Sequence, residues 1–273
     1  MDHPSDPVAY DSEAHHRIPW ERIAPFLFIA LLLVPANWLI RKLFPQHQPW
    51  LPKAFHRLIC WACGITVKTH GRRARGTVLY LPNHISWADI PALGCLMRAR
   101  FVAKEEIGES RMMRFFCEQQ RTLFVKRESR RDAARQASEL SAALHAGDSV
   151  VVFAEGTTGD LRRPLPFKSS LLSGLTEGQL EHVRIQPVSI AYTRVRSMPV
   201  VRGRFPQIAW LGHFAIEDSV KQFLRLRAVR VDIIFHEPLD PAAFEDRKQL
   251  TRAVSATVAR GYRRAMRDYI KPA

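Results

Sequence analysis

The sequence predicts an α/β fold, a layered sandwich in which helices flank a mixed, largely parallel sheet, preceded by N-terminal membrane-associating helices. Strand-like and helix-like segments alternate from about residue 64 to the C-terminus, which is typical of layered α/β domains. The region before residue 64 instead combines a long apolar stretch with a basic amphipathic one. We therefore divide the chain into a disordered N-terminus (1–19), membrane-anchoring helices (20–63) and one α/β domain (64–273).

Local patterns define the expected elements of this domain. Short runs of β-branched and aromatic residues predict strands at 65–69, 77–82, 100–103, 122–126, 149–154, 184–191 and 229–236. Apolar residues at helical spacing predict helices at 89–98, 109–119, 129–146, 168–176, 214–225 and 246–267. Pro187 should confine its strand to an edge of the sheet or to a bulge, because proline cannot donate to a ladder.

The region 20–63 carries the membrane prediction. Residues 23–40 are apolar, at the lower length limit for a span, and Pro35 and Asn37 make a simple span less favourable. We expect either a short span or a helix embedded in one leaflet, with a buried core helix as the alternative. Residues 51–63 place Lys53, His56 and Arg57 among apolar side chains, which is typical of a helix lying in a membrane interface.

Charge and cysteine content restrict the possible partners. The chain has 41 Lys and Arg against 26 Asp and Glu, a formal net charge of +15, which favours anionic partners. No zinc-finger, helix-turn-helix or RNA-binding signature is visible, so we expect an anionic membrane surface and no nucleic acid. The four cysteines read as small buried residues with no metal or disulfide role, and the folded part is expected in the cytosol.

His84 and Asp89 form the most informative pair in the sequence. They follow the apolar strand 77–82, where the chain breaks into a turn before a helix. A histidine can take a proton near neutral pH, and a carboxylate on its other nitrogen fixes the tautomer and stabilises the imidazolium. The alternative is that Asp89 only caps the helix, since Ser86-Trp-Ala-Asp89 fits a capping pattern.

Further candidate side chains follow other expected strands, where α/β enzymes usually build their sites. Lys104 follows the strand 100–103 and Arg127 follows the strand 122–126, and we assign both to substrate binding. Arginine can fork onto a phosphate or carboxylate, although a solvated charge cluster explains Arg127 equally well. Glu155-Gly156-Thr157 follows five apolar residues and could hydrogen-bond a polyol.

Four ordered blocks between about residues 55 and 215 resemble the glycerolipid acyltransferase family, of which bacterial 1-acylglycerol-3-phosphate O-acyltransferase is the type member. The family's Asn-His-x-Ser-x-x-Asp block is similar to Asn83, His84, Ser86 and Asp89. Its Phe-Ile-x-Arg block resembles Phe124 to Arg127, although the family's leading glycine is Arg121 here. Its Phe-Pro-Glu-Gly-Thr-Arg block resembles Phe153 to Thr158, and its proline-bearing block resembles Ile185 to Val188.

The resemblance implies acyl transfer from acyl carrier protein or coenzyme A to the free hydroxyl of a lysolipid, with no metal or bound cofactor. It implies that His84 and Asp89 are catalytic. The apolar segment 23–40 and the basic helix 51–63 should hold the domain on the cytoplasmic side of the inner membrane. The residues that the resemblance assigns to substrate binding are Asn83, Ser86, Arg127, Glu155, Gly156, Thr157, Thr158, Lys168 and Pro187, and Lys104 is a further candidate outside the matched blocks. A covalent intermediate on Cys95 or Cys117 is the rival mechanism, and a non-enzymatic basic lipid- or nucleic-acid-binding protein is the rival function.

One departure concerns the acceptor. The family's arginine in the third block, thought to hold the acceptor's phosphate, is Thr158 here. The run Glu155 to Asp160, followed by Pro166 to Leu171, resembles lyso-ornithine lipid acyltransferases, whose acceptor has a carboxylate and an amine. Arg127, with the three cations Arg162, Arg163 and Lys168, could still bind phosphate. The sequence keeps lysophosphatidate first and lyso-ornithine lipid as the alternative.

Overall fold

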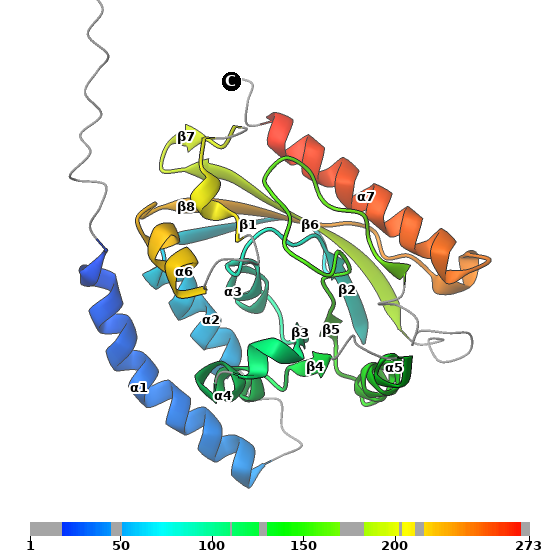
Figure 1. Cartoon of the computed structure of the whole chain (residues 1–273), viewed down its shortest axis with the longest axis horizontal. Helices are drawn as coiled ribbons and strands as arrows, with labels where there is room; N and C mark the ends of the chain where they lie inside the picture. The colour runs from blue at the N-terminus through cyan, green and yellow to red at the C-terminus, as the bar shows by residue number, and fades with distance from the viewer. Residues whose placement is uncertain are drawn as a thin grey trace, which may run out of the picture.

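The structure is a computed structural model that describes residues 18–44, 51–109, 111–125, 130–169, 183–201, 204–210 and 216–268 (Figure 1). Its strands are β1 (Ile65–Gly71), β2 (Val78–Pro82), β3 (Arg100–Lys104), β4 (Leu123–Val125), β5 (Val150–Val151), β6 (Arg184–Val195), β7 (Met198–Pro199) and β8 (Val229–Phe235). Its α-helices are α1 (Trp20–Leu43), α2 (Leu51–Ala62), α3 (Asp89–Gly94), α4 (Arg111–Gln119), α5 (Arg130–His145), α6 (Ile216–Leu224) and α7 (Arg247–Asp268). Short 3-10 helices are η1 (Glu105–Glu109), η3 (Pro206–Ile208) and η4 (Pro241–Ala243).

The described strands form one sheet in the order β1-β8-β6-β2-β5-β3-β4, with β7 paired to β6. Neighbouring strands run parallel except where β6 meets β8 and β7, so the predicted mixed, largely parallel sheet is confirmed. Every residue of β2 is buried, as expected for a strand covered on both faces. This central strand delivers the chain to the His84 turn.

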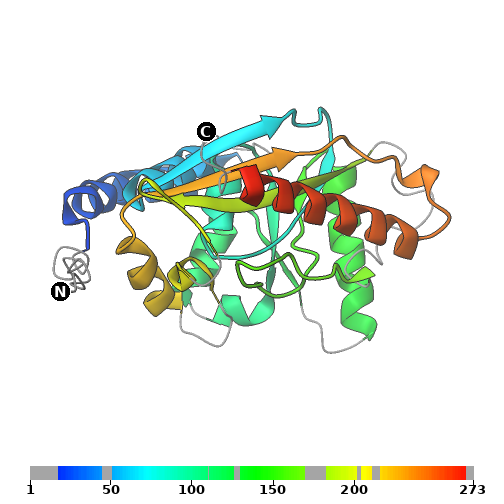
Figure 2. The same ribbon diagram turned by 90° about the horizontal axis from the view of Figure 1, so that it is seen from above.

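Alternate side chains of β2 enter two hydrophobic clusters, one on each face of the sheet. Val78 and Tyr80 join the cluster that includes residues of α2, α3 and α6. Leu79 and Leu81 join the cluster that includes residues of α5 and α7. Figures 1 and 2 show α7 lying along the sheet on the side opposite α3. The sheet is therefore the middle layer of a sandwich, and its burial fixes the position of the strand ends.

Two predicted elements are shorter than expected. The strand predicted at 149–154 pairs only at Val150 and Val151, because the chain then turns at Phe153, whose carbonyl accepts the Gly156 N–H at 3.1 Å. The helix predicted at 89–98 ends at Gly94. Most of the helix predicted at 168–176 lies outside the described residues, as does the predicted disorder of 1–17.

Pro187 does not lie on an edge strand, so that half of the expectation is wrong, but the pairing beside it is irregular: between the pairs Val188–Phe235 and Ile185–Leu239, two residues of β6 face three of the partner segment. Pro187 occupies β6 between β2 and β8, where it pairs with Leu81. The regular antiparallel ladder with β8 begins one residue after Pro187, at the pair Val188 and Phe235. A residue with a backbone N–H at position 187 would donate to the carbonyl of His236. In this chain that carbonyl instead accepts a hydrogen bond from the side-chain amide of Gln186, at 2.7 Å. A neighbouring side chain thus replaces the missing donor.

Helix α1 is continuous through Pro25 and Pro35 and exposes most of its apolar surface. Phe28 and Leu31 are 67% and 70% exposed, which contradicts the alternative of a buried core helix. Among the described residues it is the one helix long and apolar enough to cross a membrane, which indicates membrane association. Asn37, which looked unfavourable for a span, is buried and donates to the carbonyl and side chain of Gln119 on α4.

Helix α2 is amphipathic as predicted, but it packs into the domain as well. Leu51, His56, Cys60 and Ala62 are buried, and α2 contacts α3 directly. Its His56 does not belong to an exposed basic face. Burial lowers the pKa of His56 to about 4, so its imidazole is neutral near pH 7.

Candidate active site

His84 and Asp89 meet across the turn between β2 and α3. His84 Nδ1 lies 2.8 Å from Asp89 Oδ2. The same carboxylate oxygen accepts the backbone N–H groups of Ile85 at 2.7 Å and Ser86 at 2.9 Å. Asp89 thus satisfies backbone amides, as the capping alternative held, and also binds the imidazole. The carboxylate on Nδ1 leaves Nε2 as the nitrogen that can take a proton.

The second oxygen of Asp89 is held by Tyr192 from β6. The Tyr192 hydroxyl donates to Asp89 Oδ1 at 2.7 Å. Burial, and then the neighbouring Asp89 carboxylate, raise the pKa of Tyr192 well above its usual value, so the phenol stays a neutral donor. Asp89 is fully buried and accepts four hydrogen bonds, which allows a charge to persist without water. These contacts fix the orientation of the carboxylate, and hence of the histidine.

The imidazole of His84 stacks on Phe153, which begins the turn after β5. The ring centroids are 3.9 Å apart and the planes differ by 20°. The His84 side chain is 13% exposed, while that of Asp89 is fully covered. One end of the pair is therefore accessible and the other is anchored, as a general base requires.

Glu155 follows Phe153 in this turn and is 1% exposed. Burial raises the pKa of Glu155 to about 8, with the backbone amides of His84 and Leu165 opposing that rise and Asp89 adding to it. Neither carboxyl oxygen makes a hydrogen bond of normal geometry within the described residues, although these amides lie close. Glu155 is therefore largely neutral at pH 7. It lies close to the backbone of His84 and is shielded from solvent.

The residues after Glu155 connect this turn to the segment around Trp210. Gly156 has a φ of +75°, a conformation that favours glycine. Thr157 is exposed, whereas Thr158 is buried and its hydroxyl donates to the carbonyl of Trp210. Trp210 in turn donates its backbone N–H to Ile85 at 3.0 Å. Thr158 is thus linked through Trp210 to the turn that carries His84.

The other predicted substrate-binding residues separate into buried and exposed groups. Asn83 exchanges two hydrogen bonds with the backbone of Ile190, at 3.0 and 2.7 Å, which locks the start of the turn to β6. Ser86 is buried beside Tyr192. Lys104 and Lys168 are exposed, with Lys104 at the end of β3, two strands away from β2. Arg127 lies outside the described residues.

Comparison with known proteins identifies the family. The profile of the family described as Acyltransferase matches residues 64–191. The lyso-ornithine lipid O-acyltransferase of Brucella abortus (strain 2308) is 37% identical over 86% of this chain and 90% of its own length. The chain belongs to the acyltransferase family. The 1-acyl-sn-glycerol-3-phosphate acyltransferase of Neisseria gonorrhoeae is 25% identical over 66% of this chain and 68% of its own.

A solved structure supports the architecture. The crystal structure of the 1-acyl-sn-glycerophosphate (LPA) acyltransferase PlsC from Thermotoga maritima matches with a TM-score of 0.55 and 22% identity, over 88% of this chain and 97% of that one. At this identity the likeness concerns the fold. The predicted fold class, acyltransferase family and enzyme class are confirmed.

The sequence alone did not identify three residues of this acyltransferase site. Tyr192 lies on β6 and reaches Asp89, while Phe153 and Trp210 contact the catalytic turn or its neighbours. Phe153 could have been found, because it stands two residues before Glu155 in the third block. Tyr192 carries no local signal, since its contact with Asp89 depends on the pairing of β2 with β6.

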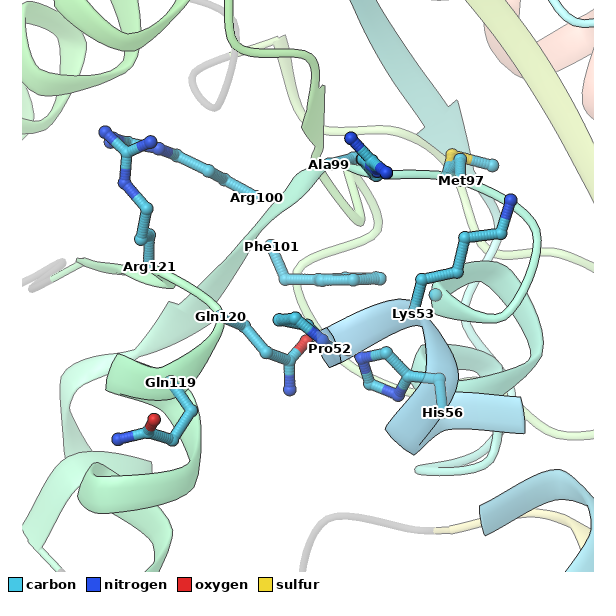
Figure 3. Close-up of a pocket in the computed structure, with 12 residues that line it drawn as sticks. Pro52, Lys53, His56, Met97, Ala99, Arg100, Phe101, Gln119, Gln120 and Arg121 are labelled. Atoms are coloured by element: carbon cyan, nitrogen blue, oxygen red, sulfur yellow. Dashed lines mark hydrogen bonds between the residues drawn. The ribbon is translucent and has the colours of Figure 1, made fainter. Parts of the chain in front are cut away.

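A small cavity of about 50 Å³ lies at the other end of α3 and is separate from the catalytic pair (Figure 3). It is lined by residues of α2, of the connection between α3 and β3, of the start of β3 and of the end of α4, and Lys53 and Arg98 are among them. His56 Nε2 lies 2.7 Å from the Gln120 side-chain oxygen at this cavity. None of the predicted site residues lines it.

Cys95, one of the two cysteines named for the rival covalent mechanism, lies away from His84 and Asp89. Cys60, Cys63 and Cys95 are buried, as expected for small core residues. Cys95 follows the C-terminal end of α3 and its thiol donates to Ala92, whereas the catalytic pair lies at the N-terminal end of that helix. Among the described residues, no three His, Cys, Asp or Glu side chains gather to hold a metal ion.

Proposed function

We propose that this acyltransferase moves a fatty acyl group from an acyl carrier protein or coenzyme A thioester to the free hydroxyl of a lyso-ornithine lipid. The observation that carries the choice of acceptor is Thr158. Where the related family has an arginine for the acceptor's phosphate, this chain has a buried hydroxyl that is already donated to Trp210. A neutral, internally bonded side chain cannot supply the charge that a phosphate calls for.

The proposed reaction uses His84 as general base. Its Nε2 removes the proton from the acceptor hydroxyl as the oxygen attacks the thioester carbonyl. The carbon–sulfur bond then breaks, and the leaving thiolate takes the proton from the imidazolium. Asp89 holds the imidazole through Nδ1 and stabilises its positive charge while the intermediate forms. No metal or bound cofactor takes part in this scheme.

Lysophosphatidate is the second candidate acceptor, and specific observations favour it. Arg162, Arg163 and Lys168 are exposed on the segment that follows Thr158 and could contact a phosphate. The Neisseria gonorrhoeae relative also carries that activity in its name. The higher identity to the lyso-ornithine enzyme and the threonine at position 158 are the grounds on which we propose the ornithine acceptor first.

The same proposal places the catalytic domain on the cytoplasmic face of the inner membrane. Helix α1 exposes apolar side chains and ends at Arg41 and Lys42, which can meet anionic headgroups. The domain then works beside the membrane from which a lysolipid must be drawn. Its donor, a carrier-protein or coenzyme A thioester, is made in the cytosol.

A competition assay tests the acceptor. The full-length enzyme receives one acyl carrier protein donor and equal concentrations of lyso-ornithine lipid and lysophosphatidate. We expect preferential acylation of lyso-ornithine lipid. Exclusive acylation of lysophosphatidate would refute the proposed acceptor, and acylation of neither, with a donor that is intact by mass spectrometry, would refute the proposed reaction.

A further inference from the structure

The segment that follows Thr158 is packed against the catalytic turn. Gly159 donates its backbone N–H to the carbonyl of His84 at 2.8 Å. A Cβ at position 159 would lie 3.3 to 3.6 Å from Leu165, from Glu155 and from the His84 carbonyl, so the backbone here fits closely. Asp160 is the next residue, so it directly follows a backbone group that is hydrogen-bonded to the turn of His84.

Asp160 and Arg162 form an exposed pair of opposite charges at this place. The backbone N–H of Arg162 donates to Asp160 Oδ1 at 2.9 Å, and its Nε lies 3.5 Å from Oδ2. The two side chains are 48% and 76% exposed, respectively. An ion pair this open to water contributes little to stability, so both groups can exchange their partner for a ligand.

The surroundings of Asp160 favour a positive ligand. Tyr262 of α7 donates its hydroxyl to the carbonyl of Leu161, the residue after Asp160. Burial raises the pKa of Tyr262, and Asp160, Asp89 and Glu155 each raise it further, so the three carboxyl groups lie close enough to act on one atom. Glu155 is largely neutral at pH 7, so the negative charge here comes from Asp160 and Asp89. With threonine at position 158, this charge suits an ammonium group better than a phosphate.

We propose that Asp160 binds the ammonium group of the acceptor headgroup and that Arg162 binds its carboxylate. This subsite rests on the proposed function, because a lyso-ornithine headgroup carries both of these charges beside a free hydroxyl elsewhere in the lipid. The pairing places one charged group against each end of a zwitterion. It also gives Asp160 a role in specificity, since its carboxylate would repel the phosphate of lysophosphatidate.

The test measures KM and kcat of the full-length enzyme with lyso-ornithine lipid and with the same lipid acetylated on its amine. Asp160→Asn should raise KM for lyso-ornithine lipid about 3- to 10-fold. This factor lies between the effect expected for losing an exposed ion pair and the effect expected for losing a hydrogen bond to a charged group. It should leave KM for the acetylated lipid unchanged, because that acceptor has no ammonium group. Asp160→Glu should restore part of the difference, and Asp218→Asn, an exposed carboxylate paired with Lys221 on α6, is the matched control.

Arg162→Gln is tested in parallel with the methyl ester of the lyso-ornithine headgroup. It should raise KM for the free acid and leave that for the ester unchanged. Equal losses on free and capped acceptors, or no change in either variant, would overturn the subsite while the wild type still acylates lyso-ornithine lipid. A wild type that acylates only lysophosphatidate would instead overturn the proposed function, and the subsite with it.

Discussion

Removing one hydroxyl tests whether the carboxylate of Asp89 is positioned from β6. Tyr192→Phe keeps the buried ring and its edge-on contact with Phe223, at 6.4 Å between centroids, and deletes only the donor to Asp89 Oδ1. The bonds from His84, Ile85 and Ser86 all go to the other oxygen. In the variant, Oδ1 of the fully buried Asp89 carboxylate therefore loses its hydrogen bond from position 192.

The expected loss follows from the kind of bond removed. A hydrogen bond to a charged group contributes about 1.5 to 3 kcal/mol, and about 1.4 kcal/mol corresponds to a tenfold change in rate. If Asp89 acts by orienting His84 and stabilising the imidazolium, this loss falls on the transition state. We expect kcat to drop about 10- to 150-fold and KM for either substrate to change little, because Tyr192 is buried and does not contact them.

The assay is steady-state acyl transfer by detergent-solubilised full-length enzyme, with Tyr262→Phe as the matched control. Tyr262 is also buried, and its hydroxyl also makes a 2.7 Å bond, but to the neutral carbonyl of Leu161. Urea unfolding of both variants measures any general loss of stability. If Tyr192→Phe lowers kcat no more than Tyr262→Phe does, the positioning role of Tyr192 is refuted.

The other predictions concern the base, the buried acid and the anchor. His84→Ala should lower kcat about a hundred- to ten-thousand-fold, with membrane association unchanged in a fractionation assay; wild-type turnover would exclude it as general base. Glu155 stays protonated in the folded state up to about pH 8 while its unfolded form ionises near 4.5, so the free energy of unfolding should fall between those values by up to about 1.4 kcal/mol per pH unit. Glu155→Gln should remove that fall, and urea midpoints at pH 5 and 8 that shift as in the wild type would contradict it. Phe28→Lys with Leu31→Lys, at exposed positions of α1, should move the enzyme from the membrane to the soluble fraction, and unchanged partition would count against an α1 anchor.

Much of the fold follows from local pattern, because the elements that bury themselves on both faces carry long apolar runs. β2 and β6 were predicted within a few residues, and α7 within one residue at each end. The exceptions come from contacts distant in sequence. Pro187 looked like an edge residue because its own strand gives no hint that the Gln186 amide would meet the carbonyl of His236. The orientation of α2 could not be read either, since α3 and Gln120 decide that His56 faces inward.

The contact between His84 and Asp89 was predictable because the two residues stand five positions apart across one turn. The residues around it were harder to interpret, since their types fit either a substrate contact or an internal brace. Asn83 and Thr158 were expected to meet the substrate, and their side chains bond to Ile190 and Trp210. Sequence shows that a polar side chain lies at a strand end. Only the packing of β6 and of the segment at Trp210 shows whether that side chain is already bonded within the protein.

The division between buried and exposed polar groups separates catalysis from acceptor choice. Asp89 and Asn83 are buried, and β6 holds both through direct hydrogen bonds, from the buried Tyr192 and with the backbone of Ile190. The segment after Glu155 instead leaves charged side chains in solvent, on a backbone that bonds to the His84 turn, among them Asp160 and Arg162. Substitutions on the exposed segment can change the headgroup that is bound without moving the general base. If Asp160 binds the acceptor's ammonium group as proposed, the same histidine and aspartate can serve a phosphate acceptor in one acyltransferase and a zwitterionic acceptor in another, and position 160 distinguishes the two.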